Sequence, residues 1–419
     1  MEIRDTTRPV VVLDPLGANL NVIRTLGRAG VPVYGVYSDP RTPAARSRYC
    51  AGAFRWPPGM SERQSVGVLL AIADRVGGTP ILIPADDMSA LLVADHADAL
   101  AEVFLFPAQP PALARKLSSK KQMYHFCKQV GVPTAETAFP QSRADVERFV
   151  ATAAFPVVLK GIDGLRLRQR GGASVLITRT PKELLACYDR HEEPGEPNLM
   201  LQEYIPGGPD TIWMFDGYFD RDSRCLIGVV GQKIRQYPAY TGMTSLGVCV
   251  RNPLVEQMTE ALMKRIAYRG IVDLGYRYDA RDGQYKLLDV NPRVGASFRL
   301  FVDSNGGDVV RAMYLDLTGQ PVPSGKPCEG RKWLVENFDI VSSFTYWRHG
   351  ELTPWAWWRS FRGVREANWF ARDDMAPFWA MCRHSLLRGL QIRPKPRRLV
   401  GRTADTGVNP RFKNVFAAR

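Results

Sequence analysis

The chain has 419 residues, of which 45% are hydrophobic and 23% are charged, and its formal net charge is +14. These proportions are typical of globular proteins and argue against a largely disordered or fibrous chain. At roughly 100–200 residues per domain, two or three domains are expected, each large enough to bury its own core.

The positive charge is concentrated at the C-terminal end. Residues 383–419 contain ten Lys and Arg residues against a single acid, Asp405, and therefore carry +9 of the net +14. Such a tail is either a solvated, flexible end or a contact for an acidic partner, such as an anionic membrane or a nucleic acid. It contains no recognisable nucleic-acid-binding module, so nucleic acid is the less favoured partner.

No targeting segment or transmembrane helix is expected. Charged residues precede the first apolar run, and no stretch approaches the ~18 apolar residues that a membrane span needs. The seven cysteines are scattered and never spaced as CxxC, which argues against a disulfide framework and a structural zinc site. We therefore expect a cytoplasmic protein; the basic tail leaves open a peripheral contact at the inner membrane face.

Strand and helix patterns alternate in the first part of the chain. A helix is expected at 19–29, and strands are expected at 10–13, 31–37, 81–84 and 104–106. This alternation predicts a parallel, doubly wound sheet with ligands at the carboxyl ends of its strands. A nicotinamide dehydrogenase is disfavoured because the turn after the first strand lacks the GxGxxG dinucleotide fingerprint.

The pattern continues through a second region and then changes. A helix is expected at 118–130, mixed strands and helices follow to about residue 320, and a Pro- and Gly-rich linker is expected at 319–330. Seven of the nine Trp residues lie after this linker, in segments with helix-start signals at Thr353-Pro354 and near residue 373. Such Trp-rich helices either pack over the body of the protein or lie in a membrane interface.

The strongest local signal is the segment 270–297, GIVDLGYRYDARDGQYKLLDVNPRVGAS. Its Asp-Gly pair at 282–283 predicts a hairpin turn between two strands. Because strand side chains alternate, Tyr285, Leu287, Asp289 and Asn291 are expected on one face. The last two side chains offer hard oxygen ligands, which suit Mg²⁺ and could help it hold phosphate oxygens.

The length of the hairpin loop determines which residues lie opposite these two. With a three-residue loop, Asp289 would face Gly275 and Asn291 would face Asp273, so that Asp273 joins the polar face. With a two-residue loop, Tyr276 would lie opposite Asp289. The sequence leaves both possibilities open.

Further charged residues could serve a polyphosphate, although each alone is also compatible with a solvated surface. Lys160 ends an apolar strand and could reach a phosphate as a compact charge or extend into water. Glu203 and Asp210 flank a glycine turn, and Lys233 and Arg235 alternate along one expected strand.

In this order, these elements resemble the ATP-grasp superfamily, and most closely its carboxylate–amine ligases, which include D-aspartate ligases. The resemblance covers about residues 10–319. It implies that two lysines contact the nucleotide phosphates, that a strand end holds the adenine and that an acid holds the ribose. The residues implied in nucleotide binding are Lys120, Lys160, Gln202, Glu203 and Asp210.

The same resemblance assigns the DVNPR segment at the end of the hairpin. It implies that Asp289 and Asn291 hold the metal and that Arg293 contacts phosphate or substrate. The family usually carries an acid close to where Gly275 stands, so Asp273 is expected to compensate as a metal ligand. Lys233 is expected to act with Arg293 in catalysis.

The implied architecture is an α/β chain in four parts. A Rossmann-like domain at 1–115 precedes a two-lobed α+β ATP-grasp module at 116–320. A Trp-rich helical extension at 321–382 and a flexible basic tail at 383–419 follow.

The implied function is ATP-dependent formation of an amide from a small carboxylate and a small amine, through an acylphosphate, with Mg²⁺ or Mn²⁺ as the metal. The alternative, motivated by Gly275, is an ATP-binding regulatory or scaffold protein with weakened catalysis.

Overall fold

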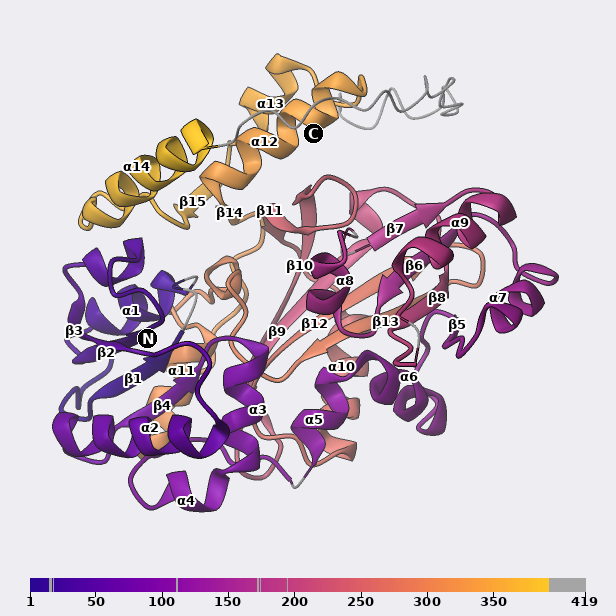
Figure 1. The fold of residues 1–419 in the computed structure, drawn as a ribbon. Coiled ribbons are helices and arrows are strands. Elements are labelled where there is room, and N and C mark those ends of the chain that lie inside the picture. The colour runs from indigo at the N-terminus through magenta and orange to yellow at the C-terminus, as the bar shows by residue number, and fades with distance from the viewer. Residues whose placement is uncertain are drawn as a thin grey trace.

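The computed structural model describes residues 1–391 with the exception of residues 15, 16, 18, 111, 172, 174 and 194. Most of the expected basic tail, from residue 392 onward, lies outside the described residues. The described part contains three sheets (Figure 1). The N-terminal sheet and a small second sheet lie on either side of a larger central sheet, and the C-terminal helices form a layer across the top of the view.

The N-terminal part is an open parallel sheet, as the strand–helix alternation predicts. The strand order is β3-β2-β1-β4, and all three pairings are parallel. The strands are β1 (Val10–Leu13), β2 (Val33–Tyr37), β3 (Cys50–Arg55) and β4 (Ile81–Pro84). The helices of this part are α1 (Leu20–Gly27), the short 3₁₀ helix η1 (Pro43–Arg46), α2 (Glu62–Val76), α3 (Asp87–Asp95) and α4 (Ala97–Ala101).

One strand prediction in this part is wrong. The segment 104–106 forms no strand, since only Leu105 makes an isolated parallel bridge, with Ile81. The fourth strand is instead β3, at the edge of the sheet, where every second side chain is exposed. Its sequence CAGAFR contains small residues and no β-branched one, so its pairing with β2 depends on tertiary contacts rather than on local propensity.

The second part, which we call the first lobe, is a small antiparallel sheet with the order β5-β8-β6-β7. Its strands are β5 (Thr137–Ala138), β6 (Val157–Gly161), β7 (Val175–Thr178) and β8 (Leu199–Glu203). The helices are α5 (Leu113–Ser118), α6 (Lys120–Gln129), α7 (Arg143–Val150), α8 (Gly164–Gln169) and α9 (Pro181–His191). The expected helix at 118–130 is α6, which begins after Ser119 because that side chain caps the first turn.

The central sheet has seven strands in the order β13-β12-β9-β10-β11-β14-β15 and is antiparallel except for the last pair. They are β9 (Ile212–Phe219), β10 (Cys225–Tyr237), β11 (Met243–Cys249), β12 (Gly270–Asp279), β13 (Gln284–Asn291), β14 (Lys332–Leu334) and β15 (Val364–Ala367). The accompanying helices are η2 (Pro209–Thr211), α10 (Pro253–Arg265), η3 (Phe298–Leu300) and α11 (Val309–Leu317). One hydrophobic core includes residues of β1, α1, β9 and α11, so the N-terminal and central sheets are packed together.

Of the two registers left open for the hairpin of β12 and β13, the structure has the one that a three-residue loop would give to the site residues. Asp289 faces Gly275 and Asn291 faces Asp273. The loop, however, has four residues, 280–283, rather than two or three. A bulge in β13 accounts for the extra residue and restores the register at the end of the hairpin.

The same bulge changes which side chains share a face. Leu287 and Val290 are both buried in the core beneath the hairpin, and Tyr285 packs against that core. Asp289 and Asn291 therefore lie on the opposite face from Tyr285 and Leu287, and the expectation that all four share one face is wrong. An extra residue reverses the alternation of side chains beyond it, which strict period-two reasoning does not anticipate.

The C-terminal extension is helical and is joined to the central sheet through β14 and β15. Its helices are α12 (Glu336–Arg348), α13 (Pro354–Ser360) and α14 (Ala376–Gln391). The predicted start of α13 is confirmed, because Thr353 caps it and Pro354 is its first residue. None of the helices in the described residues is long and apolar enough to cross a membrane.

A buried ion pair holds α12 on the sheet. The Asp339 carboxylate accepts hydrogen bonds from the Arg235 guanidinium at 2.7 and 2.9 Å, and both side chains are less than 5% exposed. Asp339→Ala is expected to lower the free energy of unfolding by about 3–5 kcal/mol, because it leaves the Arg235 charge buried without a partner. Urea denaturation measures this loss.

The matched control is Asp189→Ala, which breaks an exposed ion pair with Arg143 at 3.0 Å. That loss is expected to stay below about 1 kcal/mol. Equal losses in the two variants would contradict the structural role given to Asp339.

Candidate functional site

Two lysines from the first lobe lie close together at one side of the site. Lys160, near the end of β6, donates to the side-chain oxygen of Gln202 at 2.9 Å. Lys120, at the start of α6, donates to the carbonyl oxygen of Gly161 at 3.1 Å. Burial lowers the pKa of Lys160 to about 8. The charge of Asp289 opposes this decrease and that of Lys120 adds to it, so the region carries a positive charge that an anion would stabilise.

The residues expected at the nucleotide base and ribose have different surroundings. Gln202 is buried and bonded to Lys160, whereas Glu203 accepts hydrogen bonds from Lys286 and Arg281 of the hairpin at 3.0 and 2.7 Å. Burial alone would raise the pKa of Glu203, but its hydrogen bonds outweigh burial and hold that pKa below its usual range. Glu203 therefore joins the first lobe to the hairpin. Asp210 lies exposed on η2.

The three residues expected to hold a metal converge on one face of the hairpin. The Asn291 side-chain nitrogen lies 3.4 Å from an Asp289 carboxylate oxygen and 3.5 Å from an Asp273 carboxylate oxygen. Burial raises the pKa of Asp273, so a nearby cation would stabilise its charged form. Two carboxylates and an amide, whose oxygen a rotation of the side chain presents, fit Mg²⁺ or Mn²⁺ chemically.

This set is incomplete as a metal centre made of protein alone. Among the described residues, no three His, Cys, Asp or Glu side chains are grouped closely enough to hold a metal ion together. Mg²⁺ in phosphate-transfer sites is commonly bound by one or two carboxylates together with the phosphates of the substrate. The arrangement therefore fits a metal that arrives with a nucleotide.

Arg293 connects this face to the N-terminal sheet. Its guanidinium donates to Asp273 at 3.3 Å and to Asp87 at 2.9 Å. Asp87 begins α3, directly after the carboxyl end of β4, where the sequence predicted ligand-binding residues. Arg293 is thus held between both parts of the protein by two carboxylates, either of which a substrate anion could replace.

Lys233 approaches the same face from β10, but its neighbour Arg235 does not. Lys233 donates to the carbonyl oxygen of Gly242 at 3.2 Å; burial lowers its pKa, and the charges of Asp273 and Asp289 oppose the decrease. Arg235 was considered as a second cation here, but it is bonded to Asp339 of α12. The pairing of β10 with β11 shifts register on both sides of Arg235, which separates the two side chains.

Two residues of the site were missed by the sequence reading. Asp216 on β9 pairs with Asp273 across the sheet, is fully buried, and has no hydrogen-bond partner for either carboxylate oxygen within the described part of the chain. Arg277 on β12 donates to the carbonyl oxygen of Gly207 at 2.7 Å and lies 5.8 Å above the Tyr204 ring. The sequence does carry one signal for Asp216, because it is the only charged residue in the apolar run WMFDGYF at 213–219.

Asp216 is expected to make stability depend on pH. Burial raises the pKa of its carboxyl group well above the usual range; the charges of Asp273 and Asp308 add to this, and that of Arg293 opposes it. The folded state then holds a proton that the unfolded state releases near pH 4, so this contribution to stability falls as the pH rises above about 4.

Asp216→Asn is expected to remove that pH dependence. At pH 8 and without metal, the variant should be more stable than the wild-type protein by about 1 kcal/mol or more, because it no longer has a carboxylate to bury. Urea midpoints between pH 5 and pH 8 in the presence of a chelator measure the effect. A variant that loses stability with pH as steeply as the wild-type protein would contradict it.

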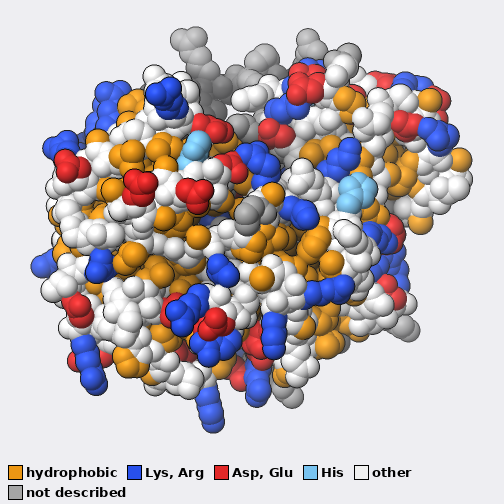
Figure 2. Space-filling view, turned by 90° about the horizontal axis from the view of Figure 1, so that it is seen from below, with side chains coloured by type: hydrophobic (Ala, Val, Ile, Leu, Met, Phe, Trp, Pro, Cys, Tyr) orange, Lys and Arg blue, Asp and Glu red, His pale blue; other side chains and the backbone are white. Residues whose placement is uncertain are grey.

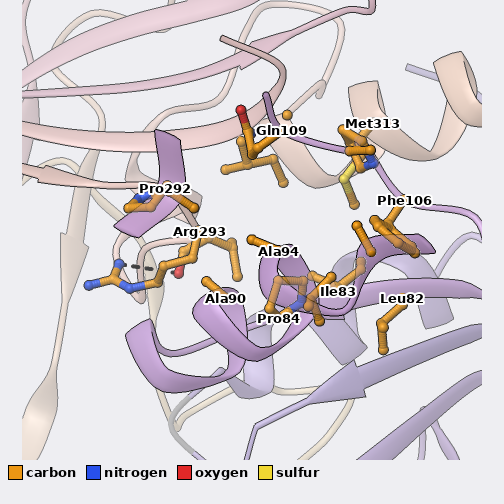
Figure 3. A pocket seen from close by; sticks show the side chains of 18 residues that line it. Leu82, Ile83, Pro84, Ala90, Ala94, Phe106, Gln109, Pro292, Arg293 and Met313 are labelled. Atoms are coloured by element: carbon orange, nitrogen blue, oxygen red, sulfur yellow. Dashed lines mark hydrogen bonds between the residues drawn. The ribbon is translucent and has the colours of Figure 1, made fainter. Parts of the chain in front are cut away.

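A small cavity lies behind Arg293, between the N-terminal and central sheets (Figure 3). Its volume is about 60 Å³, and apolar residues such as Ile83, Phe106 and Met313 line it. Figure 3 shows the Arg293 guanidinium pointing away from these side chains. A cavity of this size admits a few water molecules but no nucleotide, so the charged face of the hairpin is the better candidate site.

Comparison with known proteins gives relatives for both the sequence and the fold. No family model matches the chain. The chain is 27% identical to D-aspartate ligase of Enterococcus faecium (strain Aus0004) over 240 residues, which cover 55% of this chain and 57% of that protein. The chain therefore spans little more than half the length of this relative.

Two solved structures share most of the fold. N5-carboxyaminoimidazole synthetase from Staphylococcus aureus has a TM-score of 0.60 and 9% identity, over 83% of this chain and 89% of that one. The biotin carboxylase domain of Hydrogenobacter thermophilus 2-oxoglutarate carboxylase, in complex with MgADP, ADP and bicarbonate, has a TM-score of 0.57 and 15% identity, over 77% and 72%. The predicted resemblance is confirmed: the chain has the α/β fold of the ATP-grasp carboxylate–amine ligases and is a relative of D-aspartate ligase.

Proposed function

We propose that this chain is an ATP-dependent ligase that activates a small carboxylate as an acylphosphate and joins it to a small amine. The observation that carries the proposal is the gathering of cations from both lobes around the acidic face of the hairpin. Lys160 belongs to the first lobe and Lys233 and Arg293 to the central part, and all three are influenced by the charges of Asp273 or Asp289.

The main physical difficulty of this reaction is that the substrate carboxylate and the γ-phosphate of ATP are both anions and repel each other. The cations reduce this repulsion. Two unit charges ~4 Å apart repel by ~4 kcal/mol at an effective dielectric constant of ~20. In the proposal, Lys120 and Lys160 hold the phosphates of ATP, and Arg293 holds the carboxylate substrate or the transferred phosphoryl group. Preorganised charges of this kind lower the barrier without covalent chemistry by the protein.

The remaining residues bind and orient the nucleotide. In the proposal, Gln202 and Glu203 flank the base and Asp210 holds the ribose. Asp289, Asn291 and Asp273 would hold Mg²⁺ or Mn²⁺. When bound, such a metal neutralises charge on the phosphate oxygens.

The reaction consists of two substitutions, the first at phosphorus and the second at the acyl carbon. A carboxylate oxygen of the substrate forms a bond to the γ-phosphorus of ATP while the bond to ADP breaks. The nitrogen of the amine then bonds to the acyl carbon, phosphate leaves, and the amine releases a proton to solvent. In the proposal, Lys233 and Arg293 stabilise the negative charge in both steps.

Amino acids are the first substrates to test. D-Aspartate is included because the similar protein from Enterococcus faecium is a D-aspartate ligase. ADP release is measured for the purified full chain with ATP, Mg²⁺ or Mn²⁺, and a panel of D- and L-amino acids, alone and in pairs. ADP release that depends on an added amine supports the ligase, and mass spectrometry of the product identifies the bond formed.

The second candidate is an ATP-binding regulatory or scaffold protein, which Gly275 favours because the family's usual acid is missing there. The same measurement separates the two. Tight ATP binding without amine-dependent ADP release across the panel would favour the regulatory protein and contradict the ligase.

A further inference from the structure

Helix α12 buries mainly polar side chains and exposes a group of apolar ones. The residues that it buries are Asp339, Ser342, Ser343 and Tyr346. The residues that it exposes are Ile340, Val341, Phe344 and Trp347, each between 51% and 63% exposed. A surface helix of a globular protein normally has the reverse arrangement, with its apolar stripe facing the core.

The inverted orientation is held by specific bonds. Asp339 is paired with the buried Arg235 and also accepts a hydrogen bond from the Trp357 indole at 3.2 Å. Ser342 bonds with Ser245 of β11 at 3.0 Å. Rotating the helix to bury its apolar side would leave the Arg235 charge without a partner, which is strongly unfavourable. The outward apolar face is therefore a stable feature of this fold.

The neighbouring helices add exposed aromatic residues on the same layer of the molecule (Figure 1). Trp355 and Trp358 of α13 are each 67% exposed, and Trp379 of α14 is 62% exposed. Trp357, between the first two, turns inward to Asp339. The seven Trp residues of the extension are thus divided: four are exposed, and Trp333, Trp357 and Trp369 are buried or half-buried.

The charges of the extension are also divided between its two sides. Four of its acids face the body, where they pair with arginines: Asp339 with Arg235, Glu366 with Arg299, Asp373 with Arg28 and Asp374 with Arg24. Its exposed arginines have no carboxylate partner among the residues that the structure describes; they include Arg348, Arg359, Arg362, Arg365 and Arg372. The +9 segment 383–419 begins in α14.

The opposite side of the molecule differs. Figure 2 shows the face on the far side from α12, α13 and α14, where side chains of both charges are interspersed with hydrophobic ones. Among the residues that the structure describes, the exposed Trp and Phe side chains all belong to the extension.

We propose that the layer formed by α12, α13 and α14 is a docking surface for an anionic lipid bilayer, beyond any role in ligation. Exposed Trp and Phe side chains partition into the interfacial region of a bilayer, and each Lys or Arg near an anionic surface contributes roughly 1 kcal/mol. A second copy of the chain is a poorer occupant, because it would bring two extensions of like charge together.

Co-sedimentation of the full chain with vesicles tests the proposal. We expect binding to vesicles of phosphatidylglycerol mixed with phosphatidylcholine, release by high salt, and little binding to phosphatidylcholine alone. The double variant Trp355→Ser with Trp358→Ser should lower the vesicle partition coefficient at least about tenfold, because it removes two large interfacial side chains. Amine-dependent ADP release should be unchanged, which separates this outcome from failure of the proposed ligase activity.

The matched control replaces exposed apolar residues elsewhere, Leu70→Ser with Leu254→Ser, on α2 and α10. It should bind vesicles as the wild-type protein does. A wild-type protein that stays in the supernatant with anionic vesicles at low salt would overturn the proposal, as would equal binding by the Trp355 and Trp358 variant.

A measurement on the wild-type protein tests the proposal even if the double variant misfolds. Brominated phosphatidylcholine in anionic vesicles should quench the tryptophan fluorescence, since four Trp side chains are exposed on this layer. Absence of quenching would overturn the proposal. So would a dimer that forms without vesicles and is abolished by the double variant, because a second copy would then be the occupant.

Discussion

Lys160→Ala is expected to lower kcat/KM for ATP by about 10²–10³-fold while leaving the fold intact. The loss follows from the removal of a partly buried cation from the place proposed for the phosphates, where a preorganised charge has a large effect on the transition state. The fold should survive because, among the described residues, the lysine donates a hydrogen bond only to Gln202, and water can replace that contact. Steady-state ADP release and thermal unfolding of the purified variant measure the two effects.

The matched control is Lys182→Ala, an exposed lysine on α9, which should retain wild-type turnover. Wild-type turnover in the Lys160 variant would contradict the site assignment. The pKa of about 8 adds a second expectation: ATP affinity should weaken as the pH rises through 8, since the charged form of Lys160 is lost. Lys160→Arg stays protonated and should remove that pH dependence.

Asp289→Ala is expected to reduce ATP turnover by a similar factor, through loss of a proposed metal ligand. The defect should be accompanied by a higher Mg²⁺ concentration for half-maximal rate, which separates a metal role from a loss of folding. The control Asp74→Asn, at an exposed position of α2, should change neither quantity. Unchanged Mg²⁺ dependence in the Asp289 variant would contradict the metal assignment.

A gain-of-function variant tests the same site in the other direction. A Cβ atom at Gly275 would lie 3.8 Å from the Cβ of Asp289, an ordinary contact, so a side chain can be accommodated there. Gly275→Glu is expected to lower the Mg²⁺ concentration for half-maximal rate roughly tenfold, which corresponds to about 1.4 kcal/mol. A higher Mg²⁺ requirement would contradict the view that this position lacks a ligand.

The chemistry of the candidate site was largely readable from the sequence, because it depends on residue types in a fixed order. The sequence indicated Lys160 at a strand end, the DVNPR segment after a hairpin, and the acid at position 273. The structure brings Asp273, Asp289, Asn291 and Arg293 together. Their assignment to metal and substrate stays a prediction that the variants above test.

Contacts between distant strands were not readable in the same way. Asp216 lies beside Asp273 only because β9 pairs with β12 in a particular register, 57 residues apart along the chain. Arg235 leaves the site because its strand shifts register and Asp339 binds it. Both outcomes depend on pairings that no local pattern encodes.

By itself, the sequence indicated three of the four N-terminal strands, the helix that caps at Ser119, the family resemblance and the chemistry of the hairpin. These follow from local patterns of charge, apolar periodicity and turn residues. Only the tertiary structure decided that β3 rather than residues 104–106 is the fourth strand. It also decided that a bulge in β13 puts the side chains of Leu287 and Asp289 on different faces of the sheet. Only the tertiary structure showed that α12 buries mainly polar side chains. In each case a long-range contact outweighs the local preference: the pairing of β3 with β2, the pairing of β13 with β12, and the ion pair of Arg235 with Asp339.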